Sequence, residues 1–184
     1  RHVDWRTLEG DVAAWDALAR EASEPNPFFE SWYLLPSLRA FDPQGRTGIL
    51  RLDLAGRLVG LMPIARPSRY YRWPIPNLSS WLHDNAFLGA PLVARGHEHA
   101  FWQALLEWSD RKAGTALFLH LAHLPLDGAL HAALVETLAD RRRPWGLVMA
   151  EERALLASPL SPEAYLEQAM TGKKRKELRR QFAR

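Results

Sequence analysis

The sequence predicts a mixed α/β fold, in which a central β-sheet is flanked by helices on both faces. Short apolar runs alternate with amphipathic helical patterns in the second half, as in strands joined by crossover helices. Two strand-like runs near residue 56 are joined closely enough to form a hairpin. The 184 residues are 47% apolar and include eight tryptophans, which is enough for one sizeable core.

The predicted elements follow the order β-α-α-β-β-β-α-β-α-β-β. In chain order they are strand 3–8, helix 11–22, helix 31–41, strands 47–53 and 58–65, strand 86–93, helix 97–113, strand 115–122, helix 127–138, and strands 145–150 and 154–157.

Particular residues justify the ends of these elements. Asp11, Ser31 and Asp127 are the expected N-caps of three helices. Gly56 supplies the positive φ of the hairpin, and Gly114 is expected in the left-handed region after the helix over 97–113. The second helix contains a proline at position 36, which predicts a kink or a restart. The apolar run 115–122 reads as a buried strand.

Composition changes after Ser158, so we expect a domain over 3–158 and a helical linker over 159–184. Ser161 is the predicted N-cap of a helix with Pro162 at its first position, and Thr171 is the predicted cap of the last helix.

Positive charge is concentrated at the end of the chain. Residues 173–184 carry seven basic and one acidic side chain (+6), whereas the whole chain is +3, which leaves 1–172 at −3. A fold that grips nucleic acid usually spreads its cations over one face, so this distribution argues against a nucleic-acid partner. Leu178 and Phe182 align on one side of the last helix. That stripe is narrow for a membrane-surface helix and suits docking of a partner segment.

Several classes of chemistry are excluded by composition. With no cysteine, the chain has no disulfide, thiolate nucleophile or cysteine-ligated zinc. No apolar run is long enough for a membrane span and no leader is expected, which predicts a cytoplasmic protein. His97 and His99 do not share a helical face, so no metal site is expected.

Four phrases carry a family resemblance: PNPFFESWYLLPSLRAF, GRLVGLMPI, FLGAPLV and YLEQAMTGKKRKELRRQFAR. In order and spacing they resemble the N-terminal half of FemAB-type and CelD-like tandem-GNAT acyltransferases. The resemblance implies a GNAT-like sheet and acyl transfer to an amine or hydroxyl of a small-molecule or cell-envelope acceptor. It implies acyl-CoA, such as acetyl-CoA, as co-substrate with no tightly bound cofactor. It also implies a C-terminal GNAT-like half as partner.

The chain departs from the family's phosphate-binding loop. A GNAT domain holds the acyl-CoA pyrophosphate on backbone amides in a glycine-rich turn before a helix. Here that place reads VARGHEHAFWQALL, and no second glycine follows Gly96 at the required spacing. The donor site is therefore expected in the other half.

The candidate catalytic residues are His83 and Asp84, because a neutral histidine beside a carboxylate could accept a proton from an attacking amine. An ordinary Asx-type turn at HDN is the alternative. The candidate substrate-binding residues are Trp32, Tyr33, Tyr70, Tyr71, Trp81 and Asn85. The candidate cofactor-binding residues, for acyl-CoA phosphates, are Lys173, Lys174, Arg175, Lys176, Arg179 and Arg180.

Two other function classes remain open. The chain could be a non-catalytic module that binds a polysaccharide, a peptidoglycan precursor or RNA. It could also be a structural domain that forms a homodimer through the aromatic arm 69–73, which otherwise reads as an arm packed on a neighbouring domain.

Overall fold

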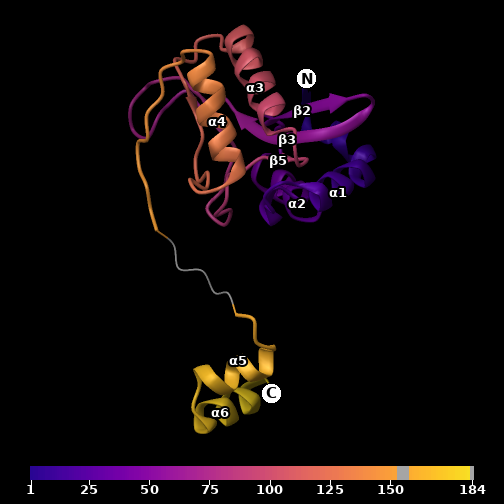
Figure 1. Cartoon of the computed structure of the whole chain (residues 1–184), viewed down its shortest axis with the longest axis vertical. Coiled ribbons are helices and arrows are strands. Elements are labelled where there is room, and N and C mark those ends of the chain that lie inside the picture. Colours follow the sequence, from indigo (N-terminus) through magenta and orange to yellow (C-terminus); the bar gives the residue numbers. More distant parts are fainter. Residues whose placement is uncertain (153–157, 183–184) are drawn as a thin grey trace. The chain divides into compact units, whose positions relative to one another are not determined.

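The computed structural model describes residues 1–152 and 158–182, and it contains two compact units, 1–145 and 146–184. The first unit holds the sheet and its core (Figure 1). The predicted strand 154–157 lies outside the described residues.

The first unit is built on a six-stranded mixed sheet, which confirms the predicted fold class. Its path runs β1-β2-β3-β4-β6, and β5 pairs separately with β3. All pairs are antiparallel except β4 with β6, which is parallel. The strands are β1 (His2–Asp4), β2 (Gly48–Leu54), β3 (Arg57–Ala65), β4 (Leu78–Ser80), β5 (Leu92–Val93) and β6 (Leu119–His120).

The β2–β3 hairpin forms as predicted. Its two connecting residues, Ala55 and Gly56, have φ of 49° and 78°, the left-handed pair that matches the twist of the strands. β3 is almost entirely buried and is the centre of the sheet.

Helices cover both faces of this sheet, as Figure 1 shows for β2 and β3 between the pair α1 and α2 and the pair α3 and α4. The helices are α1 (Val12–Glu21), α2 (Ser31–Phe41), α3 (Glu98–Lys112) and α4 (Ala129–Asp140), with 3₁₀ turns η1 (Trp5–Asp11) and η2 (Pro27–Phe29). Gly60 of β3 faces α3, because a Cβ at this position would lie 2.4 Å from the Phe101 ring. Alternate residues of β3 therefore face α1.

Several predicted strands are wrong in length or place. The first covers His2–Asp4 and then turns into η1, where the Asp4 side chain accepts from the Arg6 amide. The strand expected at 86–93 shrinks to Leu92–Val93, and β4 was missed. The run 115–122 pairs only at Leu119–His120 and is half-buried, not buried. Residues 145–150 form no strand.

Two predicted caps act differently. Asp11 is at the N-cap position of α1, but its carboxylate binds Arg51 instead of a helix amide. The α4 N-cap is Gly128, not Asp127. α2 continues through Pro36 without a restart.

Ser31 is the first residue of α2, so it does not cap the helix from outside. Gly114 has a φ of 60° just past the end of α3, as predicted.

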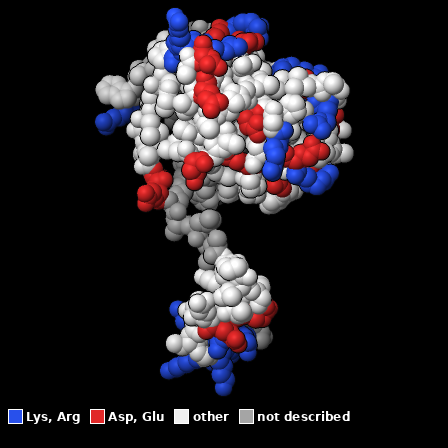
Figure 2. Space-filling view, viewed as in Figure 1, with Lys and Arg blue, Asp and Glu red and all other residues white. Residues whose placement is uncertain are grey.

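The second unit contains α5 (Pro162–Ala169) and α6 (Gly172–Phe182). The Ser161 side chain caps α5 by accepting from the Ala164 amide, and Pro162 opens the helix, as predicted. Neither helix has a buried residue. Figure 2 shows the basic side chains of this unit gathered toward one side. No helix among the described residues is long and apolar enough to cross a membrane.

Candidate functional site

His83 lies in a cluster of aromatic rings between α2 and the loop that follows β4. Its ring stacks on Phe41 at a centroid distance of 4.5 Å and on Tyr33 at 5.9 Å, and the Trp81 ring lies tilted at 5.6 Å. The Tyr33 hydroxyl donates to the Asn85 carbonyl at 2.8 Å, which ties the loop to α2. The loop and the helix therefore hold the imidazole from both sides.

The hydrogen bonds of His83 define its tautomer. The Asn85 amide donates to Nδ1 at 3.3 Å, so the neutral ring carries its proton on Nε2. Nε2 is buried and has no hydrogen-bond partner among the described residues. Burial lowers the pKa of His83, and the nearby Asp84 carboxylate opposes this in part. The ring is therefore neutral at pH 7.

This geometry limits what His83 can do as a base. Its one free lone pair, on Nδ1, already accepts from a backbone amide. To take a proton from an acceptor, Nδ1 has to leave that amide, or the proton has to move between the two nitrogens. Asp84 is exposed and shows no hydrogen bond to the imidazole, so it acts on the ring through charge.

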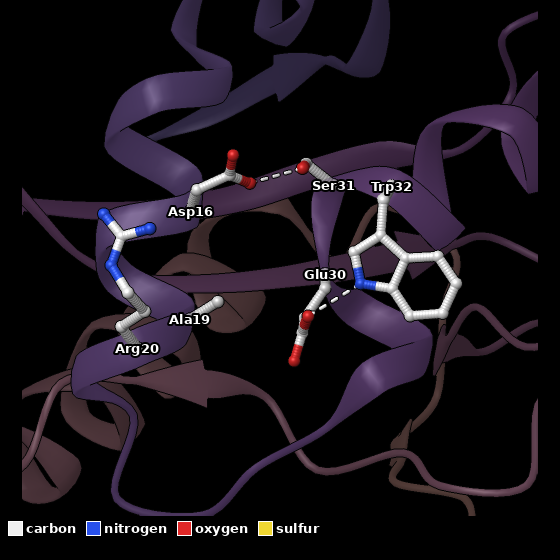
Figure 3. Close-up of a pocket in the computed structure, with 6 residues that line it drawn as sticks. All are labelled: Asp16, Ala19, Arg20, Glu30, Ser31 and Trp32. Atoms are coloured by element: carbon white, nitrogen blue, oxygen red, sulfur yellow. Dashed lines mark hydrogen bonds between the residues drawn. The ribbon is translucent and has the colours of Figure 1, made fainter.

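A groove of about 330 Å³ lies beside this cluster, between α1 and the start of α2 (Figure 3). Its lining residues are Asp16, Ala19, Arg20, Glu30, Ser31 and Trp32. The buried Ser31 hydroxyl donates to Asp16 at 2.5 Å, and the Trp32 indole N–H donates to Glu30 at 2.7 Å. These bonds fix both carboxylates at the rim while leaving acceptor capacity on each.

The groove combines two carboxylates, one guanidinium and one exposed indole face. Trp32 is 64% exposed, and its ring lies 5.7 Å from Tyr33, which in turn stacks on His83. The rings of Trp32 and Tyr33 therefore link the groove to the aromatic cluster, and the two together are the candidate site. A carboxylate beside an indole face is suited to a cationic or hydroxyl-bearing group.

The structure brings six of the predicted site residues together within the first unit. Trp32, Tyr33, Trp81, His83, Asp84 and Asn85 lie in or next to the aromatic cluster. Tyr70 instead contacts Tyr71, Phe118 and His120, next to β6. The six predicted cofactor-binding cations lie on α6, in the second unit.

Several residues of the candidate site were not predicted from the sequence. Phe41 could have been found, because it shares one face of α2 with Tyr33, eight residues earlier. Asp16 and Ser31 meet from two different elements 15 residues apart, and no local pattern signals that contact.

The loop before α3 has no amides available for a pyrophosphate. The amides of Ala94, Arg95 and His97 donate to backbone carbonyls. The Gly96 amide donates to the Glu98 carboxylate at 3.1 Å. Because that carboxylate occupies the helix N-terminus, it repels a second anion there. The sequence lacks the glycine pattern of a phosphate-binding loop, and in the structure the amides of this loop are occupied by other acceptors.

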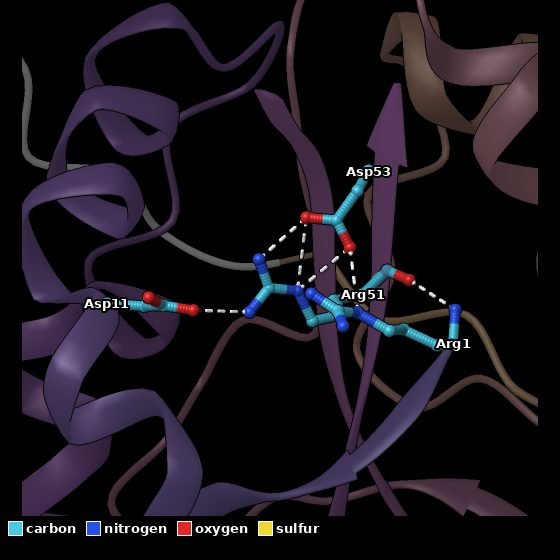
Figure 4. A network of polar contacts seen from close by, with 4 residues as sticks. All are labelled: Arg1, Asp11, Arg51 and Asp53. Carbon is cyan, nitrogen blue, oxygen red and sulfur yellow. Dashed lines mark hydrogen bonds and ion pairs between the residues drawn. The ribbon is translucent and has the colours of Figure 1, made fainter. Parts of the chain in front are cut away.

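A buried ionic network holds α1 on the sheet (Figure 4). The Arg51 guanidinium, with a side chain 8% exposed, binds Asp53 and Asp11 at 2.6 Å each. Burial alone would raise the pKa of Asp53, but Arg51 overcomes this and lowers it. The network joins β2 to the N-terminus of α1, the helix that carries Asp16.

Within residues 1–152 and 158–182, no group of three or more histidine and acidic side chains is arranged to hold a metal ion.

Comparisons with known proteins give weak likenesses. No family model matches the chain, and no curated protein sequence matches it. A ribosomal-protein-alanine N-acetyltransferase from Brucella melitensis biovar Abortus 2308 resembles it with 12% identity and a TM-score of 0.45, over 85% of this chain and 97% of that one. An aminoglycoside acetyltransferase from an uncultured soil metagenomic sample, in complex with sisomicin, resembles it with 14% identity and a TM-score of 0.42. This likeness covers 88% of this chain and 95% of the acetyltransferase. These values are too low to assign a family. The mixed α/β architecture is established by the sheet itself.

Proposed function

We propose that the chain is the acceptor-binding half of a GNAT-type acyltransferase that transfers an acyl group from acyl-CoA to an amine or hydroxyl. The four sequence phrases support this assignment, as does the mixed sheet with helices on both faces. The acceptor is a small molecule or a cell-envelope precursor, and the protein works in the cytoplasm.

The observation that carries the proposal is the link between the groove and the His83 cluster through the rings of Trp32 and Tyr33. Asp16 and Glu30 bind a donor group of the acceptor, and the Trp32 face packs against its carbon skeleton. His83, which its lowered pKa keeps neutral, leaves the Asn85 amide and takes the proton on Nδ1 as the amine or hydroxyl attacks the thioester and CoA departs as the thiolate.

In this proposal a C-terminal GNAT-like half binds the acyl-CoA. The amides of residues 94–97 support this, because each of them already donates to a carbonyl or carboxylate and is not available to a pyrophosphate. Residues 159–184 are the linker toward the second half. The cations of α6, Lys173, Lys174, Arg175, Lys176, Arg179 and Arg180, contact the acyl-CoA phosphates.

The test compares this chain with one that continues past Arg184. A thiol reagent reports the released CoA, and this chain contributes no background because it has no cysteine. With a panel of primary amines, the longer chain should transfer acetyl groups, and the 184-residue chain should bind amines but not acetyl-CoA. The proposal is wrong if the longer chain shows no transfer to any amine or hydroxyl compound.

Matched variants locate the acceptor site within the longer chain. Asp16→Asn and Glu30→Gln should raise KM for the acceptor about tenfold, the effect of losing one charged hydrogen bond. Glu136→Gln is the control, because this exposed carboxylate of α4 is outside the groove lining.

A second candidate, a non-catalytic module that binds a polysaccharide or a peptidoglycan precursor, is favoured by the exposed rings. Trp32, Phe41 and Phe87 are each more than half exposed, and exposed rings stack on sugar faces. A chain that binds a glycan but never transfers an acyl group, even when extended, would support this candidate.

A further inference from the structure

Arg20 is the cation of the groove between α1 and α2 (Figure 3). It lies on α1 one turn after Asp16, a spacing that commonly gives an ion pair on a helix. The Asp16 carboxylate instead turns toward α2, where it accepts from the buried Ser31 hydroxyl at 2.5 Å. Arg20 makes no ion pair, hydrogen bond or ring contact within residues 1–152 and 158–182, so its guanidinium is free to bind a ligand.

The two carboxylates of the groove are only half engaged. Asp16 accepts through Oδ1 from Ser31, and Glu30 accepts through Oε2 from the Trp32 indole N–H at 2.7 Å. Their other oxygens, Oδ2 and Oε1, have no hydrogen-bond partner in the described part of the chain. An ionised carboxylate accepts at both oxygens, so each can still bind a cationic donor. The groove therefore offers free acceptors and a free guanidinium together.

These charges select the ligand. A simple amine would pair with the carboxylates, but it would leave Arg20 unpaired and be repelled by it. A simple carboxylate would pair with Arg20 but would face two like charges. A molecule that carries an ammonium and a carboxylate close together satisfies both kinds of group. Asp16 and Arg20 are four residues apart, which is about 6 Å along the helix axis and suits two charged groups on one carbon atom.

We propose that the groove binds an α-amino acid, with its ammonium on Asp16 and Glu30 and its carboxylate on Arg20. The proposal rests on the proposed function, because it takes the groove as the acceptor site and names its substrate class. The groove volume of about 330 Å³ suits one such molecule. The face of Trp32, which is 64% exposed, packs against the apolar part of its side chain.

This mode of binding also determines which group is acylated. An ammonium held by carboxylates keeps its proton and has no lone pair, so it is not a nucleophile. The acceptor group is therefore an amine or hydroxyl on the side chain of the amino acid. That side chain extends from the groove along Trp32 and Tyr33, whose rings are 5.7 Å apart, toward His83, whose ring is 5.9 Å from Tyr33.

Matched ligands test the binding on the 184-residue chain without any transfer step. Norleucine carries both charges, norleucine amide carries only the ammonium, and hexanoate carries only the carboxylate. Calorimetry should give norleucine a dissociation constant about tenfold lower than either of the others, the effect of one charged hydrogen bond. Diaminopentane, with two ammonium groups, should bind no more tightly than the amide. The indole N–H resonance of Trp32 should shift when norleucine is added, which locates the site.

Arg20→Gln tests the contact with the carboxylate. Arg20 is exposed, so circular dichroism should report the natural fold. Norleucine and its amide should bind this variant equally, because the carboxylate has lost its partner. Arg111→Gln is the control, because this exposed arginine lies on α3, at the other face of the sheet (Figure 1). The control should keep the difference of about tenfold.

Three binding results would overturn the proposal. The first is no binding of norleucine at millimolar concentration. The second is equal binding of norleucine and its amide to the natural chain. The third is tighter binding of diaminopentane than of norleucine.

The extended chain separates this inference from the proposed function. It should acetylate ornithine on the side-chain amine, and mass spectrometry identifies the position. Acetylation on the α-amine would overturn the orientation proposed here. Transfer to simple amines without norleucine binding would retain the proposed function and overturn the amino-acid site. Norleucine binding without transfer to any amine or hydroxyl would retain the site and overturn the proposed function.

Discussion

The contacts around His83 determine the protonation state of its ring. Its ring is held by three aromatic neighbours, and its Nε2 proton is buried with no hydrogen-bond partner in the part of the chain that the structure describes. Protonation of the ring would place a charge in this apolar setting, and burial accordingly lowers the pKa below the usual 6.5. The folded state therefore favours the neutral ring more strongly than the unfolded state does.

The sign of the resulting pH dependence follows from that lowered pKa. Below about pH 6.5 the unfolded chain binds a proton that the folded chain resists, so the free energy of unfolding falls as the pH drops. His83→Gln should make the stability curve between pH 5 and pH 7 flatter, as measured by urea unfolding. Burial also lowers the pKa of His2 and His120, so some slope should remain. An unchanged slope in the variant would contradict this account.

Arg51 is the residue whose loss should affect stability most within the ionic network. Arg51→Met leaves the partly buried Asp53 with only the more exposed Arg1 as a cation, and breaking the Arg51 pair should cost about 2–4 kcal/mol. Arg57→Met is the matched control, because the Arg57–Glu21 pair is exposed on both sides and should contribute at most about 1 kcal/mol. Denaturant unfolding measures the free energy of unfolding of both variants. An equal decrease in the two would show that the burial of Arg51 does not strengthen its ion pairs.

At the scale of elements, the sheet and α3 approach closely because β3 has a glycine at the contact. A Cβ at position 60 would lie 2.4 Å from the Phe101 ring and 3.3 Å from Leu52. Gly60→Ala should therefore push the ring out of place and destabilise the protein by about 1–3 kcal/mol. Gly10→Ala is the control, since a Cβ at position 10 meets no atom within 4 Å. Thermal unfolding of both variants would show the difference, and a neutral Gly60→Ala would mean that the ring repacks freely.

The elements predicted well from sequence are those whose signal is local. The four long helices and the β2–β3 hairpin follow from apolar spacing and from residues such as Gly56 and Gly114. β4 and β6 were missed or misjudged because only two or three residues of each pair, so their patterns are too short to read. Residues 145–150 have the composition of a strand, but a strand also needs a partner edge, which no local pattern provides.

The candidate site was partly predictable for the same reason. His83, Trp81 and Asn85 are close in sequence, and their polar break in an apolar run is visible. The groove depends on where α1 packs against α2, and that placement depends on the Arg51 network and on the Asp16–Ser31 bond. The Asp16–Ser31 and Asp11–Arg51 contacts join residues 15 and 40 positions apart, and contacts over such distances produce no periodic pattern in the sequence.

At the scale of the whole chain, burial is divided unevenly between the two units. The first unit contains every residue of the hydrophobic core, including β2, β3 and the inner faces of four helices. In the second unit α5 and α6 have no buried residue, and Phe182 is 90% exposed. Isolated helices of 8 and 11 residues are too short to be stable without packing.

Hydrogen exchange should therefore separate the two units. Amides of β3 and α3 should exchange only through global unfolding, because their side chains are buried. Amides of α6 should exchange within the first minutes, at close to the rate of an unfolded peptide. Strong protection of α6 in the 184-residue chain would show that this helix is covered, and the proposed role of its cations as a free phosphate-binding surface would then be wrong. The same experiment on the extended chain should show α6 protected, since the proposed second half packs against Leu178 and Phe182.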